Sequence, residues 1–316
     1  TVLHKSAHVA SRVVEKVLVG HTAPVLCLAA LPRGMLASGS CDNTIRVWST
    51  AQGACVQTLP HHTGWVNCLA YDPPSAHLLS GSYDRTVTLW DAGRLAKLHT
   101  LRGHEGSVTC LAVYPRGNAV SAAMDSRVIV WDTRARRAAM QLLGHERAPL
   151  CLRTVGETYL LSGGRDKSVR VWDLRTGRPL WKMVGHTDWV RCLVCTGDLA
   201  NLVPISAGLD GRVVSWNMRT GKAVNAVQAH DGAANTMFLS GYFRSLVTAG
   251  GDNLVKLWDP STFKLRATLT GHTDEITTAT AFGRFIATGS ADHKVKLWNP
   301  LINKEPRPSR AHTPSL

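Results

Sequence analysis

Long apolar runs are missing from this chain of 316 residues. No stretch approaches the ~18 consecutive apolar residues that a membrane-spanning helix needs. The N-terminus also lacks the basic segment followed by an apolar one that marks a secretory signal peptide. We therefore expect no membrane insertion. The first residue is Thr1 rather than Met, which leaves open that the chain is a fragment.

Acidic residues are scarce, with 22 Asp and Glu against 36 Lys and Arg, so the formal net charge is +14. Residues 133–182 hold eleven Lys and Arg against four Asp and Glu, which is half of the excess. Such an uneven positive surface favours acidic proteins, nucleic-acid backbones or anionic surfaces as partners. Arg outnumbers Lys 25 to 11, however, and a GC-rich genome produces this bias without selection for binding.

The eight cysteines do not have the spacing of a disulfide framework. Five of them occupy one repeat position, six residues after a recurrent histidine: Cys27, Cys68, Cys110, Cys151 and Cys192. That position suits a small buried side chain in an inner strand. Cys192 and Cys195 form a CxxC, but no second pair follows at zinc-ribbon spacing. We expect no metal, no cofactor and a reducing compartment, either the cytosol or the nucleus.

Four residue types recur seven times at near-fixed spacing: a His, a Ser or Thr, an Asp and a Trp. The Asp stands four residues after the hydroxyl residue and six before the Trp. The histidines are His21, His62, His104, His145, His186, His230 and His272. The hydroxyl residues are Ser38, Ser80, Ser121, Ser162, Ser206, Thr248 and Thr288. The aspartates are Asp42, Asp84, Asp125, Asp166, Asp210, Asp252 and Asp292. The tryptophans are Trp48, Trp90, Trp131, Trp172, Trp216, Trp258 and Trp298.

Successive histidines are 41, 42, 41, 41, 44 and 42 residues apart, which is the period of a four-stranded propeller blade. By these residues the chain resembles the WD40-repeat family over residues 11–298. The resemblance implies an all-β fold, a seven-bladed WD40 β-propeller. Within each repeat, alternating apolar segments separated by Gly, Asn and Asp agree with strands and turns.

The last repeat stops at Trp298 without a fourth strand, whereas residues 13–18 are patterned like the fourth strands of other repeats. We therefore predict that segment 11–19 supplies the outer strand of the last blade, so that the N-terminal strand closes the ring. Residues 1–10 are predicted to be loose. Residues 299–316, with four prolines and scattered Lys and Arg, are predicted to form a flexible basic tail.

His, Ser and Asp together also suggest a catalytic triad, but a set that occurs seven times does not fit an enzyme with one site. The resemblance implies instead a buried hydrogen-bonded network that joins the Trp, the hydroxyl, the His and the Asp of each blade. The sequence contains no nucleotide-binding loop, paired-carboxylate site or metal cluster that we recognise. We predict that the protein is not an enzyme.

Function is then expected at positions that vary between blades. In this family three positions per blade point to the face on which the His and Asp turns open: the two that flank the first aliphatic residue of the inner strand, and the one before the Asp. Before the aliphatic residue stand Pro24, Trp65, Ser107, Ala148, Trp189, Ala233 and Glu275. After it stand Leu26, Asn67, Thr109, Leu150, Arg191, Asn235 and Thr277. Before the Asp stand Cys41, Tyr83, Met124, Arg165, Leu209, Gly251 and Ala291.

Trp, Tyr and Arg, the types enriched at binding hot spots, fall at two places in this ring. Trp65 and Tyr83 are predicted to form an aromatic patch on blade 2, and Arg165, Arg191 and Trp189 a second patch on blades 4 and 5.

The two arginines resemble the phosphate-reading positions of F-box-type phosphodegron receptors, although Leu150 stands where those receptors have a further Arg. Two guanidinium groups can clamp one phosphate or carboxylate. The alternative is that Arg165 pairs with Asp188 and the tryptophans pack in the rim.

Basic loops follow two of the tryptophans, and we expect them on the opposite face of the ring. They contain Arg134, Arg136, Arg137, Arg175 and Arg178. The sequences at 131–134 and 172–175 have the form WDxR, which resembles the form that substrate receptors of cullin-4 ubiquitin ligases use to dock their adaptor. The third sequence of this series, at 216–219, departs from it at Asn217.

We therefore expect a non-catalytic protein-interaction scaffold that binds an acidic or phosphorylated partner segment on the His/Asp-turn face, within a multi-subunit complex. One alternative is a substrate receptor of a cullin-RING ubiquitin ligase that docks through its WDxR turns. Another is an RNA- or ribonucleoprotein-associated propeller that uses the basic loops of blades 3 and 4, although no nucleic-acid motif accompanies them.

Overall fold

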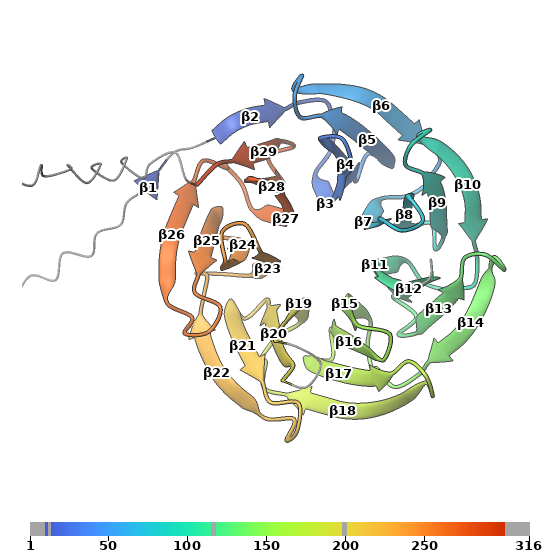
Figure 1. Cartoon of the computed structure of the whole chain (residues 1–316), viewed down its shortest axis with the longest axis vertical. Coiled ribbons are helices and arrows are strands. Elements are labelled where there is room, and N and C mark those ends of the chain that lie inside the picture. The colour runs from blue at the N-terminus through green and yellow to red at the C-terminus, as the bar shows by residue number, and fades with distance from the viewer. Residues whose placement is uncertain (1–9, 12–13, 115–117, 198–200, 301–316) are drawn as a thin grey trace, which may run out of the picture.

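The structure, a computed structural model, describes residues 10–11, 14–114, 118–197 and 201–300, and every regular element among them is a β-strand. The strands form seven sheets around one axis, which makes a seven-bladed propeller (Figure 1). The predicted fold class is therefore confirmed. Within these ranges there is no helix that could span a membrane.

The blades follow the order of the chain. Blade 1 contains β3 (Val25–Leu31), β4 (Met35–Ser40), β5 (Thr44–Ser49) and β6 (Ala54–Pro60). Blade 2 contains β7 (Val66–Asp72), β8 (His77–Ser82), β9 (Val87–Asp91) and β10 (Ala96–Leu101). Blade 3 contains β11 (Val108–Tyr114), β12 (Asn118–Ala123), β13 (Val128–Asp132) and β14 (Arg137–Leu142). Blade 4 contains β15 (Pro149–Val155), β16 (Tyr159–Gly164), β17 (Ser168–Asp173) and β18 (Arg178–Val184).

The remaining blades are built in the same way. Blade 5 contains β19 (Val190–Thr196), β20 (Val203–Gly208), β21 (Arg212–Trp216) and β22 (Ala223–Gln228). Blade 6 contains β23 (Ala234–Ser240), β24 (Ser245–Gly250), β25 (Leu254–Trp258) and β26 (Leu265–Thr270), to which β1 (Ala10–Ser11) is added. Blade 7 contains β27 (Ile276–Phe282), β28 (Phe285–Ser290), β29 (Val295–Trp298) and β2 (Val14–Leu18).

The ring closes as predicted, because β2 pairs antiparallel with β29 and so completes blade 7. Ala10 and Ser11 do not continue this strand: they pair in parallel with Thr268 and Leu269 at the outer edge of blade 6. Asn299, the first residue of the predicted tail, is buried. The rest of the two predicted loose termini, residues 1–9 and 301–316, lies outside the described residues.

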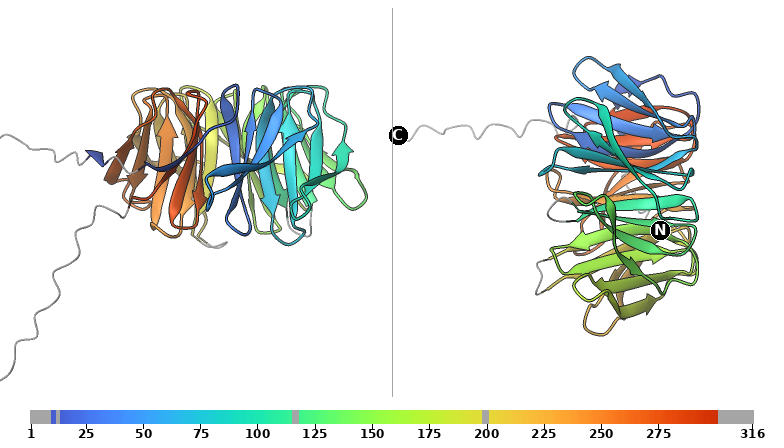
Figure 2. Two further views of the ribbon diagram at one scale, coloured as in Figure 1. Left: turned by 90° about the horizontal axis from the view of Figure 1, so that it is seen from above. Right: turned by 90° about the vertical axis from the view of Figure 1, so that its right-hand side faces the viewer.

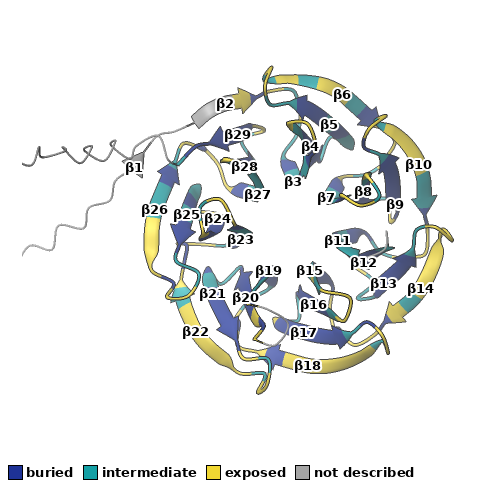
Figure 3. Cartoon of the chain, viewed as in Figure 1, coloured by how far each residue is buried: buried dark blue, intermediate teal, exposed yellow. Residues whose placement is uncertain are grey.

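The strands run between two flat faces, which the turned views make visible (Figure 2). One face carries two kinds of turn: the turn before each inner strand and the turn between the second and third strands. We call it the His/Asp-turn face. The opposite face, which in blades 1 to 6 carries the turn after the recurrent Trp, is the Trp-turn face. The inner strands lie nearest the axis, and the outermost strands form an exposed rim (Figure 3).

The turn between the second and third strands is tight in every blade. The residue after the recurrent Asp has a positive φ, between 63° and 72°, in all seven blades. The Asp side chain accepts the backbone N–H two residues further on, as Asp84 does from Thr86 at 3.0 Å. Asp favours such turns because its short carboxylate satisfies a local backbone donor.

The core is divided among the junctions between blades. One buried cluster combines Leu79, Val87 and Leu101 of blade 2 with Ile129 and Trp131 of blade 3. Because each recurrent Trp packs against the preceding blade in this way, no blade buries its apolar surface alone.

Candidate partner-binding face

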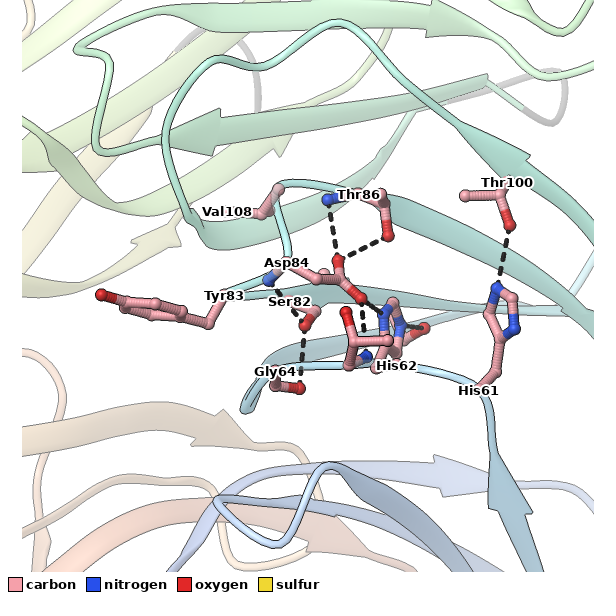
Figure 4. A network of polar contacts seen from close by, with 12 residues as sticks. His61, His62, Gly64, Ser82, Tyr83, Asp84, Thr86, Thr100 and Val108 are labelled. Atoms are coloured by element: carbon pink, nitrogen blue, oxygen red, sulfur yellow. Dashed lines mark hydrogen bonds and ion pairs between the residues drawn. The ribbon is translucent and has the colours of Figure 1, made fainter.

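The recurrent network is present in all seven blades. The His Nδ1 lies 2.7–3.1 Å from an Asp oxygen, and the His Nε2 lies 2.6–2.8 Å from the Ser or Thr hydroxyl. The Trp Nε1–H donates to the same hydroxyl oxygen at 2.7–2.8 Å. Figure 4 shows this region of blade 2, where Tyr83 points away from the network. The recurrent residues are therefore framework, as the resemblance implied.

The protonation states within this network follow from the geometry. Because the Trp already donates to the hydroxyl oxygen, the hydroxyl proton is free to be donated to the His Nε2, and the His Nδ1–H to the Asp. Burial lowers the pKa of His21, His104 and His272 more than the neighbouring carboxylate raises it. At Asp252 burial favours a higher pKa, but the hydrogen bond and charge of His230, with Lys256, lower it to about 2. The pKa is also lowered at Asp42, Asp125 and Asp292, so near neutral pH a neutral imidazole lies against an ionised carboxylate in the pairs formed by His21, His104 and His272.

The three predicted face positions are linked within each blade. The N–H of the residue before the Asp donates to the carbonyl of the residue before the inner-strand aliphatic position, as from Arg165 to Ala148 and from Leu209 to Trp189, both at 2.9 Å. The residue after the aliphatic position is a β-bulge residue in every inner strand, since it has no partner on the second strand. A bulge points a side chain in a different direction from the one it would have in a regular strand.

Four of these bulge residues tie neighbouring blades together. Their side chains donate to a carbonyl on the inner strand of the next blade, from Asn67 to Val108, Thr109 to Pro149, Asn235 to Ile276 and Thr277 to Val25. In blades 1, 4 and 5 the bulge residue is Leu26, Leu150 or Arg191, and a cysteine thiol takes over the contact with the next blade. Arg191 therefore remains exposed.

Arg165 and Trp189 meet across the junction of blades 4 and 5. The Arg165 guanidinium carbon lies 4.3 Å from the Trp189 ring centroid, a cation–π contact. The Arg165 Nε is buried and has no hydrogen-bond partner among the described residues. The Asp188 carboxylate accepts the N–H of Trp189, and in the described part of the chain no carboxylate forms an ion pair with Arg165. The alternative pairing of Arg165 with Asp188 is therefore not present.

Arg191 belongs to the same junction. It lies two residues beyond Trp189, on β19. Its positive charge also acts on blade 4: burial raises the pKa of Cys151 there, and the charge of Arg191 opposes that rise. Leu150 is half-buried on β15. The structure thus places Arg165 against Trp189, and Arg191 follows two residues later, on β19. We call these three residues the arginine patch.

The aromatic patch is a separate feature. Trp65 and Tyr83 pack on each other in blade 2, with ring centroids 5.6 Å apart, and they are 51% and 57% exposed. Blades 3 and 4 lie between them and Trp189 along the ring. The two patches are therefore separate candidate contacts.

The basic loops lie on the Trp-turn face, because they connect β13 to β14 and β17 to β18. Arg134, Arg136, Arg137, Arg175 and Arg178 are all exposed. The N–H groups of Arg134 and Arg175 donate to Asp132 and Asp173, which fixes the two turns in the same form.

Comparison with known proteins gives the family. The model described as "WD domain, G-beta repeat" matches residues 12–49, 53–91, 95–132, 139–173, 177–217, 221–259 and 263–299. The chain belongs to the WD40 family. WD40 propellers typically serve as protein-interaction scaffolds and are generally non-catalytic.

The curated relatives are similar over short stretches. Human WD repeat-containing protein 86 is 54% identical over 41 residues, 13% of this chain and 11% of that protein. Ribosome assembly protein 4 of Chaetomium thermophilum is 38% identical over 73 residues, 22% of this chain and 14% of that protein. Drosophila melanogaster F-box/WD repeat-containing protein 7 is 45% identical over 51 residues, 16% of this chain and 4% of that protein. The chain thus spans no more than 14% of these three relatives.

The five cysteines at the shared repeat position have the structural role that the sequence predicts. Cys27, Cys68, Cys110, Cys151 and Cys192 are all buried and free. Burial raises the pKa of Cys192 to about 12 and that of Cys195 to about 11, so the CxxC thiols stay protonated. Among the described residues no group of three or more His, Cys, Asp or Glu side chains is arranged to hold a metal ion.

One feature of the WD40 ring escaped the sequence analysis. A groove between blades 4 and 5 opens on the Trp-turn side, lined by Leu180 and Trp181 of β18 and Val224 of β22. The sequence did contain one sign of this groove: the apolar pair Leu180-Trp181 stands in an outer strand in which most side chains are exposed.

Proposed function

We propose that this propeller is a non-catalytic scaffold of the cytosol or nucleus that binds an acidic or phosphorylated segment of a partner protein through the arginine patch. The observation that carries the proposal is Arg165, which stacks on Trp189 and has no carboxylate partner among the described residues, with the exposed Arg191 two residues beyond Trp189. A phosphate or carboxylate would bridge the two guanidinium groups. Trp189 would hold Arg165 in place and offer an apolar surface next to the anion.

The family context agrees with this proposal. One relative is named as an F-box/WD repeat-containing protein, and 51 residues of this chain are 45% identical to it. The half-buried Leu150 lies where a third arginine would stand in phosphodegron receptors, so we expect a weaker anion clamp. Trp65 and Tyr83 would serve as an additional contact for a long partner segment.

The test is affinity purification of the chain beside its Arg165→Glu/Arg191→Glu variant, with and without phosphatase, followed by mass spectrometry. A partner lost in both the variant and the phosphatase-treated sample is the expected result, with at least about tenfold lower recovery for each. The matched control is Arg134→Glu/Arg175→Glu, which makes the same change of charge on the Trp-turn face.

An unchanged set of partners for the Arg165/Arg191 variant would refute the proposal. Equal losses in both double variants would reduce it to a general effect of net charge.

The same control variant separates the alternatives, for which the exposed basic loops are the supporting observation. Loss of a co-purifying cullin-4 adaptor from the Arg134/Arg175 variant would favour a ligase receptor. Retention on heparin or RNA that falls steeply with salt, and that Arg134→Glu/Arg136→Glu/Arg137→Glu abolishes, would favour a ribonucleoprotein component. The likeness to ribosome assembly protein 4 gives the second alternative some weight.

A further inference from the structure

The groove between blades 4 and 5 has a volume of about 400 Å³ and is lined in part by apolar side chains. Its walls are β18 of blade 4 and β20–β22 of blade 5. Three apolar side chains in these walls remain open to solvent: Leu180 at 44%, Trp181 at 40% and Val224 at 66% exposure. Apolar side chains clustered in a groove indicate an interaction surface more strongly than scattered ones do.

The residues that meet beside the groove differ from those at comparable junctions. Between blades 1 and 2, 3 and 4, and 4 and 5, an outer-strand residue meets a turn residue with positive φ from the next blade. Gln57 donates to the Leu95 carbonyl between blades 1 and 2, and Met140 occupies the space beside Gly177 between blades 3 and 4. In blade 6 the turn residue Phe263 is itself buried.

Between blades 4 and 5 the partners are Trp181 and Gly221. Gly221 has φ +66° and lies beside the Trp181 indole, which is 40% exposed. The connection from Thr196 to Val203 is also longer than its counterpart in blade 4, from Val155 to Tyr159, and it contributes Leu202 to the lining. The groove is therefore a departure of this chain from its own repeat.

The charge of the groove selects its occupant. Arg219 is the only charged side chain in the described lining, and it is exposed. Arg178 and Lys222, which precede the apolar residues on β18 and β22, are exposed as well. Among the described residues, Asp173 pairs with the lining residue Tyr159, and its carboxylate is engaged by Arg175 and Thr176. An apolar floor with a cationic border complements an apolar side chain flanked by carboxylates.

We propose that this groove binds a segment of a partner protein in which one or two bulky apolar residues are flanked by Asp or Glu. A small molecule fits less well, because ligand pockets bury most of their ligand whereas these walls are half-exposed. A polypeptide would cover them and could also pair with the outer edge of β18, as Ala10 and Ser11 pair with the outer edge of β26. The inference is independent of the arginine patch, which lies on the opposite face.

The experiment uses the whole chain and an arrayed set of synthetic peptides about twelve residues long. The two central residues are Phe-Leu, Trp-Leu or Ala-Ala, and the flanks are Asp/Glu, Ser or Lys. Binding is measured by fluorescence anisotropy up to about 1 mM peptide. Three variants are compared: Val224→Glu in the groove, Arg165→Glu/Arg191→Glu on the other face, and Val56→Glu as the matched control. Val56 is the bulge residue of β6, as Val224 is of β22, and it is 51% exposed.

We expect binding by the peptides with an apolar centre and acidic flanks, and at least about tenfold weaker binding when either feature is removed. Val224→Glu should weaken that binding about tenfold, because it places a carboxylate where the apolar side chain docks, whereas Val56→Glu and the Arg165/Arg191 variant should not. Absence of binding by every apolar–acidic peptide would overturn the inference. So would binding that Val224→Glu leaves intact, or that only the Arg165/Arg191 variant removes.

Discussion

Blades 2 and 5 share one framework and differ at the same few positions. Both have a Trp before the aliphatic residue of the inner strand. In blade 2, Trp65 packs on Tyr83 of its own blade, and Asn67 donates to the carbonyl of Val108 in blade 3. In blade 5, Trp189 lies under Arg165 from blade 4, and Arg191 makes no such bond.

The difference shows how a repeat acquires a site. The bulge position holds the ring together wherever its side chain is a short donor, and it becomes available to a ligand where it is a long cation. Blade 5 loses one inter-blade side-chain bond and replaces it with the Cys192 thiol, which donates to Asn235 at 3.1 Å. The site that we propose thus includes a position that contributes to stability in four other blades.

Acid should have the largest effect, because it acts on the framework that both blades share. Asp252 has a pKa of about 2 in the folded chain, below that of an unfolded Asp, so its contribution to stability is full above about pH 4 and is lost as the pH falls toward 2. The lowered pKa of His21, His104 and His272 acts in the same direction below about pH 6.5, since the unfolded chain binds the proton more tightly. The melting temperature, followed by circular dichroism, should fall below pH 6.5 and more steeply below pH 4; a constant value from pH 7 to 3 would contradict this.

Removal of a framework Trp comes next. Trp90→Ala in blade 2 should lower the free energy of unfolding by about 3–5 kcal/mol, because it opens a buried cavity and leaves the Ser80 hydroxyl without its donor. Trp65→Ala in the same blade should cost no more than about 1.5 kcal/mol, the value of an exposed aromatic pair. Urea unfolding of both variants tests this, and equal losses would mean that Trp65 belongs to the framework.

Substitution of the bulge residues compares the stability contributions of the two blades directly. Asn67→Ala should cost about 1–3 kcal/mol, because it removes the donor to the carbonyl of Val108. Arg191→Ala in blade 5 should change the free energy of unfolding by no more than about 0.5 kcal/mol, as expected for an exposed side chain. Urea unfolding of both variants measures these free energies. If Arg191→Ala lowered the free energy of unfolding as much as Asn67→Ala does, Arg191 would belong to the framework.

The smallest effect concerns the two tryptophans of the face. Trp189→Ala should weaken binding of a phosphorylated partner segment several-fold, since a cation–π contact is worth about 0.5–2 kcal/mol and positions Arg165. Trp65→Ala should have little effect on the same peptide. Titration calorimetry with one phosphopeptide and both variants measures the difference, and a reversed order would move the anion site to blade 2.

The framework could be predicted from the sequence because each blade repeats it. Seven copies of the His, hydroxyl, Asp and Trp set indicated the seven blades, and residues 13–18 indicated the closing strand, which the structure locates at Val14–Leu18. The pairing of Ala10 and Ser11 with blade 6 was not predicted. Arg165 and Trp189 could be named as face residues, but their stacking could not be predicted, since it depends on how blade 4 is rotated against blade 5. The groove at Trp181 was missed because it depends on which residues of two neighbouring blades lie beside each other.

The closing strand has a mechanical consequence. Val14 at the start of β2 pairs with Trp298 at the end of β29, so the two ends of the described ring emerge beside each other. Tension applied between them would break the β2–β29 hydrogen bonds one after another, as in a zipper, instead of shearing all of them together. Force applied between the arginine patch and the groove would not pass through this seam, because both lie at blades 4 and 5, where the chain is continuous. The ring is thus weakest under load from its own ends and strongest where we expect partners to pull.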